Sequence, residues 1–284
     1  MALPAIAALV VFSYIPLSGY VMAFQKLDLK KGIFKSPWVG LKNFEFLFTT
    51  SDAWIITRNT VLYNLVFIVL GMFFAVVLAL LMSELTWKRW SKTLQTVLIM
   101  PHFLSMVAVS MVVYAFFSPT NGFINSVLGE QVNWYGKKEI WPFLLTVVHL
   151  WKHVGYDSII YMAVISGIST EHYEAACLDG ASKLQQAWYI TFPHLKTIIC
   201  INLIRKLGGI FDSDFGLFYT VPQDSGAIYS VTQVLDTYIF RGLTSLNNPG
   251  MSTAASLYKA LVGFVLVLIV NKIVSKIDRE SAMF

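Results

Sequence analysis

Charged side chains are scarce in this sequence. Only 13% of its 284 residues are Asp, Glu, Lys or Arg, whereas 56% are hydrophobic and the mean hydropathy is +0.64. A soluble domain carries about 25% charged residues, so this class is excluded and an integral membrane protein is predicted. The length accommodates about six spans of roughly 20 residues each. We therefore expect an all-α polytopic fold with a single transmembrane domain, residues 1–284.

Nucleotide-binding and catalytic motifs are absent from the sequence. It contains no GxxxxGK[ST] phosphate loop and no HExxH, GxSxG or GxGxxG pattern. We therefore expect this chain to bind no ATP, to carry no cofactor and to catalyse no covalent step, so any energy source must lie on another chain. Its two cysteines, Cys177 and Cys200, have no metal-binding or redox spacing and are expected to be free thiols.

Long apolar runs predict six membrane spans. They cover residues 2–24, 59–82, 94–117, 141–168, 194–218 and 253–274. Pro16 and Gly19 interrupt the first run, which neighbouring helices can accommodate within a membrane. Charge does not settle the orientation, because the expected outer loop 26–58 carries six Lys or Arg residues against the positive-inside tendency.

The polar connector 169–193, between the fourth and fifth runs, has an ordered pattern. Ser169 or Thr170 can cap a short helix, and a glycine then permits a turn into a second helix. The pattern resembles the EAA loop of binding-protein-dependent ABC importer permeases, with matching positions at Glu174, Ala175, Ala176, Asp179, Gly180, Ala181, Ile190 and Pro193. The resemblance implies that this loop is cytoplasmic and inserts into a cleft of an ATPase, with Glu174 facing a basic residue. The alternative is an amphipathic connector lying on the membrane surface.

The resemblance extends over nearly the whole chain. SYIPLSGYVMAFQ (13–25), DTYIFRGL (236–243) and TAASLYKALVGFVLVLIVNKIVSK near the end look like the carbohydrate-importer permeases, especially those for polysaccharides, aldouronates and alginate. This implies a bacterial inner-membrane protein, surrounded by lipid, with four kinds of partner: a second permease, two ATPases that bind ATP and Mg²⁺, an extracytoplasmic solute-binding protein and an oligosaccharide. Nucleic acid is not among them. The segment 221–224 departs from the glycine-proline signature of many sugar permeases, which weakens inference of the exact sugar.

Ionisable residues within the predicted spans suggest what passes through, because they usually face a bundle interior or a water-filled path. In maltose-type permeases the sugar is held by the spans on either side of the EAA loop. By position, the resemblance places His149, Tyr156, Lys206, Gly208 and Gly209 on the path. In one interpretation, Lys206, with Lys152 or Arg205, binds carboxylates of an acidic oligosaccharide while Trp151, Tyr156 or Phe215 stacks on sugar faces. In the other, Arg205 and Lys206 pair with Asp212 and Asp214 on the same helix or through the partner permease.

Two alternatives concern ions. His149 and His153 stand at i and i+4, a spacing that can chelate a metal, but no third ligand of suitable spacing accompanies them in the sequence, so no metal is expected. A secondary carrier would use Asp212 and Asp214 as ion or proton sites. The absence of an internal repeat and the EAA-like loop argue against such a carrier. A permease of the same superfamily for a non-sugar solute is the third possibility.

Overall fold

The protein is all-α, as predicted. The computed structural model describes residues 3–28, 30–85 and 88–277, and helices dominate these ranges, which contain no strand. The first predicted span begins at residue 2, which lies outside them. The α-helices are α1 (Leu3–Leu9), α2 (Phe46–Thr49), α3 (Asp52–Ser83), α4 (Lys88–Phe103), α5 (Met106–Phe117), α6 (Phe123–Leu128), α7 (Trp141–Ser166), α8 (Thr170–Leu178), α9 (Lys183–Gln186), α10 (Phe192–Gly208), α11 (Phe215–Thr220), α12 (Tyr229–Thr232), α13 (Leu235–Thr244) and α14 (Pro249–Ile277).

Several helices are long and apolar enough to cross a membrane. The segments Leu3–Phe24, Asp52–Ser83 and Pro249–Ile269 meet that criterion, and the pair Arg89–Phe103 and Met106–Phe117 adds a fourth if it counts as one broken span. The predicted fourth and fifth spans, which contain α7 and α10, do not meet it within the described residues. Membrane spanning is therefore supported, while the count of six stays a prediction.

Two predicted spans are interrupted in the structure. The run 94–117 bends by 97° where α4 gives way to α5, and Ser105 caps the new helix by accepting a hydrogen bond from the backbone N–H of Ala108. The run 194–218 was expected to be helical to Phe218, but α10 ends at Gly208 and α11 begins at Phe215. Adjacent glycines weaken a helix, and the side chain of Asp214 caps α11, so the chain restarts there.

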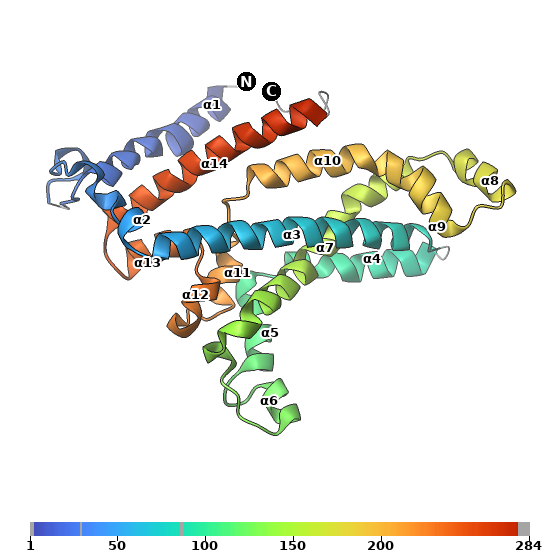
Figure 1. The fold of residues 1–284 in the computed structure, drawn as a ribbon, viewed down its shortest axis with the longest axis horizontal. Coiled ribbons are helices and arrows are strands. Elements are labelled where there is room, and N and C mark those ends of the chain that lie inside the picture. The colour runs from blue at the N-terminus through green and yellow to red at the C-terminus, as the bar shows by residue number, and fades with distance from the viewer. Residues whose placement is uncertain (1–2, 29, 86–87, 278–284) are drawn as a thin grey trace.

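The core is built around α7, which crosses α3 diagonally (Figure 1). Trp141, Leu145 and Val148 of α7 are buried with Phe67 of α3 and with residues of α11. Further along, Ala75 and Ala79 of α3 pack with Tyr161 of α7 and Leu195 of α10. The short helices α8 and α9 lie together at one end, beside the adjoining ends of α3 and α4 (Figure 1). The connector thus projects beyond the core.

Candidate coupling loop and transport path

The connector 169–193 folds into two short helices joined by a tight turn. Ser169 caps α8 by accepting a hydrogen bond from the backbone N–H of Glu171, and Ser182 forms a capping box with Gln185 at α9. Gly180 lies between them with φ +78°, a left-handed conformation that favours glycine. The two helices, the Ser169 cap and the glycine turn follow the sequence prediction.

The connector presents an exposed surface of small and apolar residues. No residue of α8 is buried, and Glu174, Ala175, Asp179 and Gly180 are exposed, whereas Ala176, Ala181 and Ile190 are partly buried. Leu178 and Leu184 are 91% and 81% exposed. Large apolar side chains left in the open commonly mark a surface that meets a partner or a membrane. Pro193 stands in the first turn of α10, directly after the π-helical turn Ala187–Thr191.

Side-chain hydrogen bonds hold the helices of the connector together. The buried amide of Gln186 donates to the carbonyl of Ala181 over 3.1 Å and contacts the Sγ atom of Cys177, so it ties α9 to the turn and α8. The hydroxyls of Tyr173 and Thr191 lie 2.9 Å apart and link α8 to the start of α10. The role of Gln186 could not be predicted from the sequence, because a lone glutamine in a polar connector gives no signal.

One ion pair joins the connector to a membrane helix. The Nζ atom of Lys183 lies 3.0 Å from Oε2 of Glu84, directly after α3. The hydrogen bond and the negative charge of Glu84 raise the pKa of Lys183 above its usual value. Both side chains are largely exposed, so the pair orients the connector more than it stabilises the fold.

The lysine predicted to meet acidic substrate is already paired in the structure. The Nζ atom of Lys206 on α10 lies 2.6 Å from Oδ2 of Asp157 on α7. The structural interpretation paired Lys206 with Asp212 or Asp214 on the same helix, which is wrong within this chain, while pairing through the partner permease stays a prediction. The break after Gly208 takes both aspartates off the helix, and Asp212 instead lies 2.9 Å from Lys259 of α14.

Lys152 has a role in the fold that the sequence did not reveal. Its buried Nζ atom donates hydrogen bonds to the carbonyls of Pro101, His102 and Leu104, the first two over 3.3 and 2.9 Å. The last carbonyls of a helix lack partners within it and attract a cation. Lys152 therefore stabilises the end of α4 at the bend.

The aromatic residues that were predicted to stack on sugar faces lie in separate places. The ring of Tyr156 stacks on His102 at 4.0 Å, and the ring of Phe215 stacks on Tyr219 at 5.0 Å. Trp151 is half exposed and lines an apolar pocket between α3, α4 and α7. Gly208 lines a pocket of about 470 Å³ together with Asp212, Asp236 and Lys259. The structure therefore does not gather all the predicted path residues.

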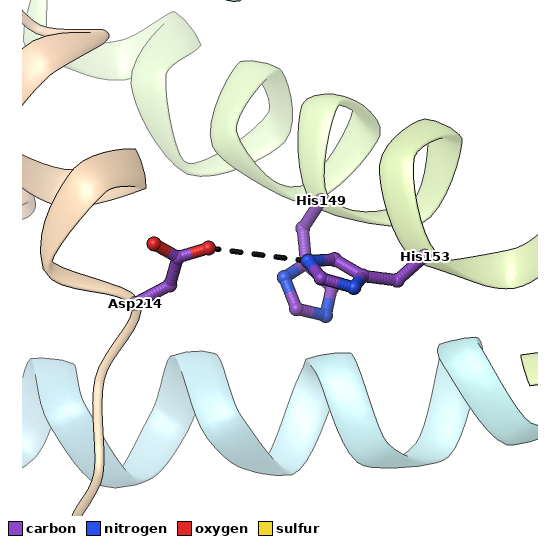
Figure 2. A group of neighbouring side chains, drawn as sticks. All are labelled: His149, His153 and Asp214. Carbon is purple, nitrogen blue, oxygen red and sulfur yellow. Dashed lines mark ion pairs between the residues drawn. The ribbon is translucent and has the colours of Figure 1, made fainter. Parts of the chain in front are cut away.

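His149 and His153 do meet a third polar group. Their side chains project from α7 toward Asp214, which precedes α11 (Figure 2). The Nε2 atom of His153 lies 3.9 Å from Oδ2 of Asp214, and one ligand atom of each of the three residues lies within 4.8 Å of the others. The sequence offered no third group at a recognisable spacing, because Asp214 arrives through the break between α10 and α11.

Comparison with known proteins decides the family. Residues 68–279 match the family described as binding-protein-dependent transport system inner membrane component. This chain belongs to that family. The predicted resemblance to ABC importer permeases is confirmed, and the chain is a membrane component rather than a catalytic subunit. The assignment also sets aside the secondary-carrier alternative.

Curated relatives and solved structures extend the match over the whole chain. The polygalacturonan/rhamnogalacturonan transport system permease protein YteP of Bacillus subtilis is 34% identical, over 99% of this chain and 88% of the relative. The trehalose/maltose permease protein MalF of Thermococcus litoralis is 26% identical, over 98% and 92%. A chain of a bacterial ABC transporter for import of the acidic polysaccharide alginate superposes with a TM-score of 0.87 at 30% identity, covering 97% of this chain and 94% of that one.

Proposed function

We propose that this permease forms one half of an ABC importer core that moves an acidic oligosaccharide into a bacterial cell. The observation that carries the proposal is the superposition, at 30% identity, on a chain of the transporter for the acidic polysaccharide alginate. The relative named for polygalacturonan transport supports the same substrate class, since polygalacturonan is also a polymer of uronic acid.

The partners follow from the family and from the exposed connector. A second permease would complete the path, two ATPases holding ATP and Mg²⁺ would dock on the connectors, and an extracytoplasmic binding protein would deliver the sugar. A related crystal structure contains an alginate ABC transporter in complex with a periplasmic protein bound to alginate pentasaccharide. In this chain, Leu178 and Leu184 would enter the ATPase cleft as a helix enters a groove. Lipid would cover outward-facing residues such as Phe12 and Phe143, which are 79% and 75% exposed.

Recognition of a carboxylate requires a change at Lys206. Because its ammonium lies against Asp157, an acidic sugar would have to replace that carboxylate as the partner of Lys206. Such an exchange keeps a positive charge paired in a poorly solvated place. Tyr156 and Phe215 offer aromatic rings for stacking, and His149 would stand nearby on the wall formed by α7.

Transport would follow alternating access. ATP binding closes the ATPases and draws the two connectors together, and the Glu84–Lys183 pair passes this movement to α3 as the cavity turns outward. Hydrolysis then resets the cavity. The loaded binding protein and ATP must favour the same state for this coupling to work.

The test is ATP hydrolysis by the reconstituted assembly with its binding protein, comparing uronate oligosaccharides with neutral ones of matched length. We expect stimulation by the acidic sugars alone. Stimulation by neutral sugars alone would contradict the substrate class and leave the importer assignment intact. Failure of any ATPase to co-purify with the chain would contradict the proposed assembly.

A further inference from the structure

The cluster of His149, His153 and Asp214 has the composition of a metal site. The two imidazoles stand one turn apart on α7, and the carboxylate approaches from the segment before α11 (Figure 2). Their ligand atoms lie within 4.8 Å of one another, but the closest His153–Asp214 approach, 3.9 Å, is too long for a hydrogen bond. The three groups therefore converge without satisfying each other.

Unpaired nitrogens are the second observation. The Nδ1 atom of His149 and the Nε2 atom of His153 are buried and have no hydrogen-bond partner among the described residues. Leaving a buried polar atom unpaired costs about 1–3 kcal/mol, so each such atom calls for a partner such as water or an ion. Both histidines belong to the group whose ligand atoms lie within 4.8 Å of one another, which favours a single shared cation.

The cluster is also held in position by its neighbours. The ring of His149 stacks on Phe67 of α3, with centroids 3.8 Å apart and planes 6° from parallel. The Oδ1 atom of Asp214 accepts a hydrogen bond from the backbone N–H of Leu217, which leaves Oδ2 directed at the histidines. Ligands of a tetrahedral metal lie about 2.0–2.2 Å from it, so small side-chain rotations would complete the site.

Charge distinguishes Asp214 from the neighbouring acidic residues. Asp157 pairs with Lys206, Asp212 and Asp236 pair with Lys259, and Asp224 pairs with Arg241. The ion-pair partner of Asp214 is instead a histidine, which carries charge only when protonated. The Asp214 side chain is 30% exposed, so its charge is only partly solvated and an adjacent positive charge would stabilise it. A divalent cation would supply the missing positive charge.

We infer that His149, His153 and Asp214 bind a transition-metal dication, of which Zn²⁺ is the best match. Two imidazoles and one carboxylate suit Zn²⁺, Co²⁺ or Ni²⁺ better than Mg²⁺ or Ca²⁺, which take oxygen ligands. Three protein ligands leave a fourth position for water. The bound ion would link α7 to the segment before α11 and would restrict their relative movement during transport.

The test uses Co²⁺ as a spectroscopic probe on the purified full chain in whatever assembly it forms. A Cys177→Ser background removes the exposed thiol, which would otherwise bind the metal. We expect one equivalent of Co²⁺ to give visible d–d bands typical of a tetrahedral N/O site, and Zn²⁺ to abolish them. This readout needs no sugar and no ATP, so it succeeds or fails independently of the proposed transport activity.

Variants locate the site. Asp214→Asn keeps an oxygen to cap α11 but removes the charged ligand, and His153→Gln removes one imidazole. We expect each to weaken Co²⁺ binding by at least about 10-fold. The matched control is His194→Gln, since His172 and His194 form another histidine pair with rings 6.2 Å apart on the connector side, and it should bind Co²⁺ as the parent does. Absence of the d–d bands in the parent, or unchanged binding in both site variants, would overturn the inference.

Discussion

The ammonium of Lys206 lies 2.6 Å from the carboxylate of Asp157 and joins α10 to α7. These helices flank the connector 169–193, one before it and one after it. The pair therefore stabilises the packing of α7 against α10, the two helices that the connector joins. A charge that looks in the sequence like a substrate contact is, in this conformation, part of the packing between helices.

Removal of either partner should destabilise the protein. Loss of one member of a buried ion pair costs about 3–5 kcal/mol, and because these side chains are still 22% and 20% exposed, we expect about 1–3 kcal/mol for Lys206→Met or Asp157→Leu. The double variant should regain much of the loss. Thermal unfolding of the detergent-purified parent, the two single variants and the double variant measures the coupling energy between Lys206 and Asp157. If Lys206→Met unfolds like the parent, the pair with Asp157 does not stabilise the fold, and a loss of uronate transport in that variant would reflect substrate binding alone.

Lys152→Met should destabilise the bend between α4 and α5. Methionine has a similar length but cannot donate to the carbonyls of Pro101 and His102, so the buried acceptors lose their partner. We expect a loss of about 2–4 kcal/mol, seen as a lower unfolding temperature and faster proteolysis near residue 104. Lys196→Met on α10 is the matched control, because Lys196 is exposed and should change stability by less than about 0.5 kcal/mol. If Lys152→Met and Lys196→Met lowered stability equally, the conclusion that Lys152 stabilises the bend would be contradicted.

Glu174→Ala should uncouple ATP hydrolysis from uptake without unfolding the chain. Glu174 is exposed on α8, so its removal leaves no buried group unpaired. We expect uptake to fall by at least about 10-fold, which corresponds to about 1.4 kcal/mol of lost coupling. Glu130, exposed in the distant segment after α6, is the control, and Glu130→Ala should transport normally. Normal uptake by Glu174→Ala would favour the alternative in which the connector only lies on the membrane surface.

The Glu84–Lys183 pair should make a small contribution that depends on pH. Glu84 raises the pKa of Lys183 above the ordinary value for lysine, so the contribution is present below that ordinary pKa and is lost as pH rises through the raised pKa. Since both groups are exposed, a double-mutant cycle with Glu84→Gln and Lys183→Met should give about 0.2–1 kcal/mol at neutral pH. Added salt should reduce it. If the coupling energy persisted at a pH above the raised pKa of Lys183, it could not come from the ion pair between Glu84 and protonated Lys183.

Some features were predictable because they depend on local sequence. Scarce charge and long apolar runs indicate membrane helices, and Ser169 and Gly180 act through their own backbone neighbourhood. The ion pairs were not predictable in this way, since Asp157 meets Lys206 only after two helices pack. The bend after Phe103 depends on Lys152 from another helix. Asp214 reaches the histidines because α10 stops at Gly208, a boundary that the continuous apolar run conceals.

The Lys152 ammonium donates its hydrogen bonds to main-chain carbonyls, at residues 101, 102 and 104. This has an evolutionary consequence. Every residue type offers the same carbonyl, so the contact places no demand on which side chains stand at positions 102 and 104. Related permeases that keep this bend should therefore retain a lysine on the facing helix, while the residue types at positions 102 and 104 vary among them.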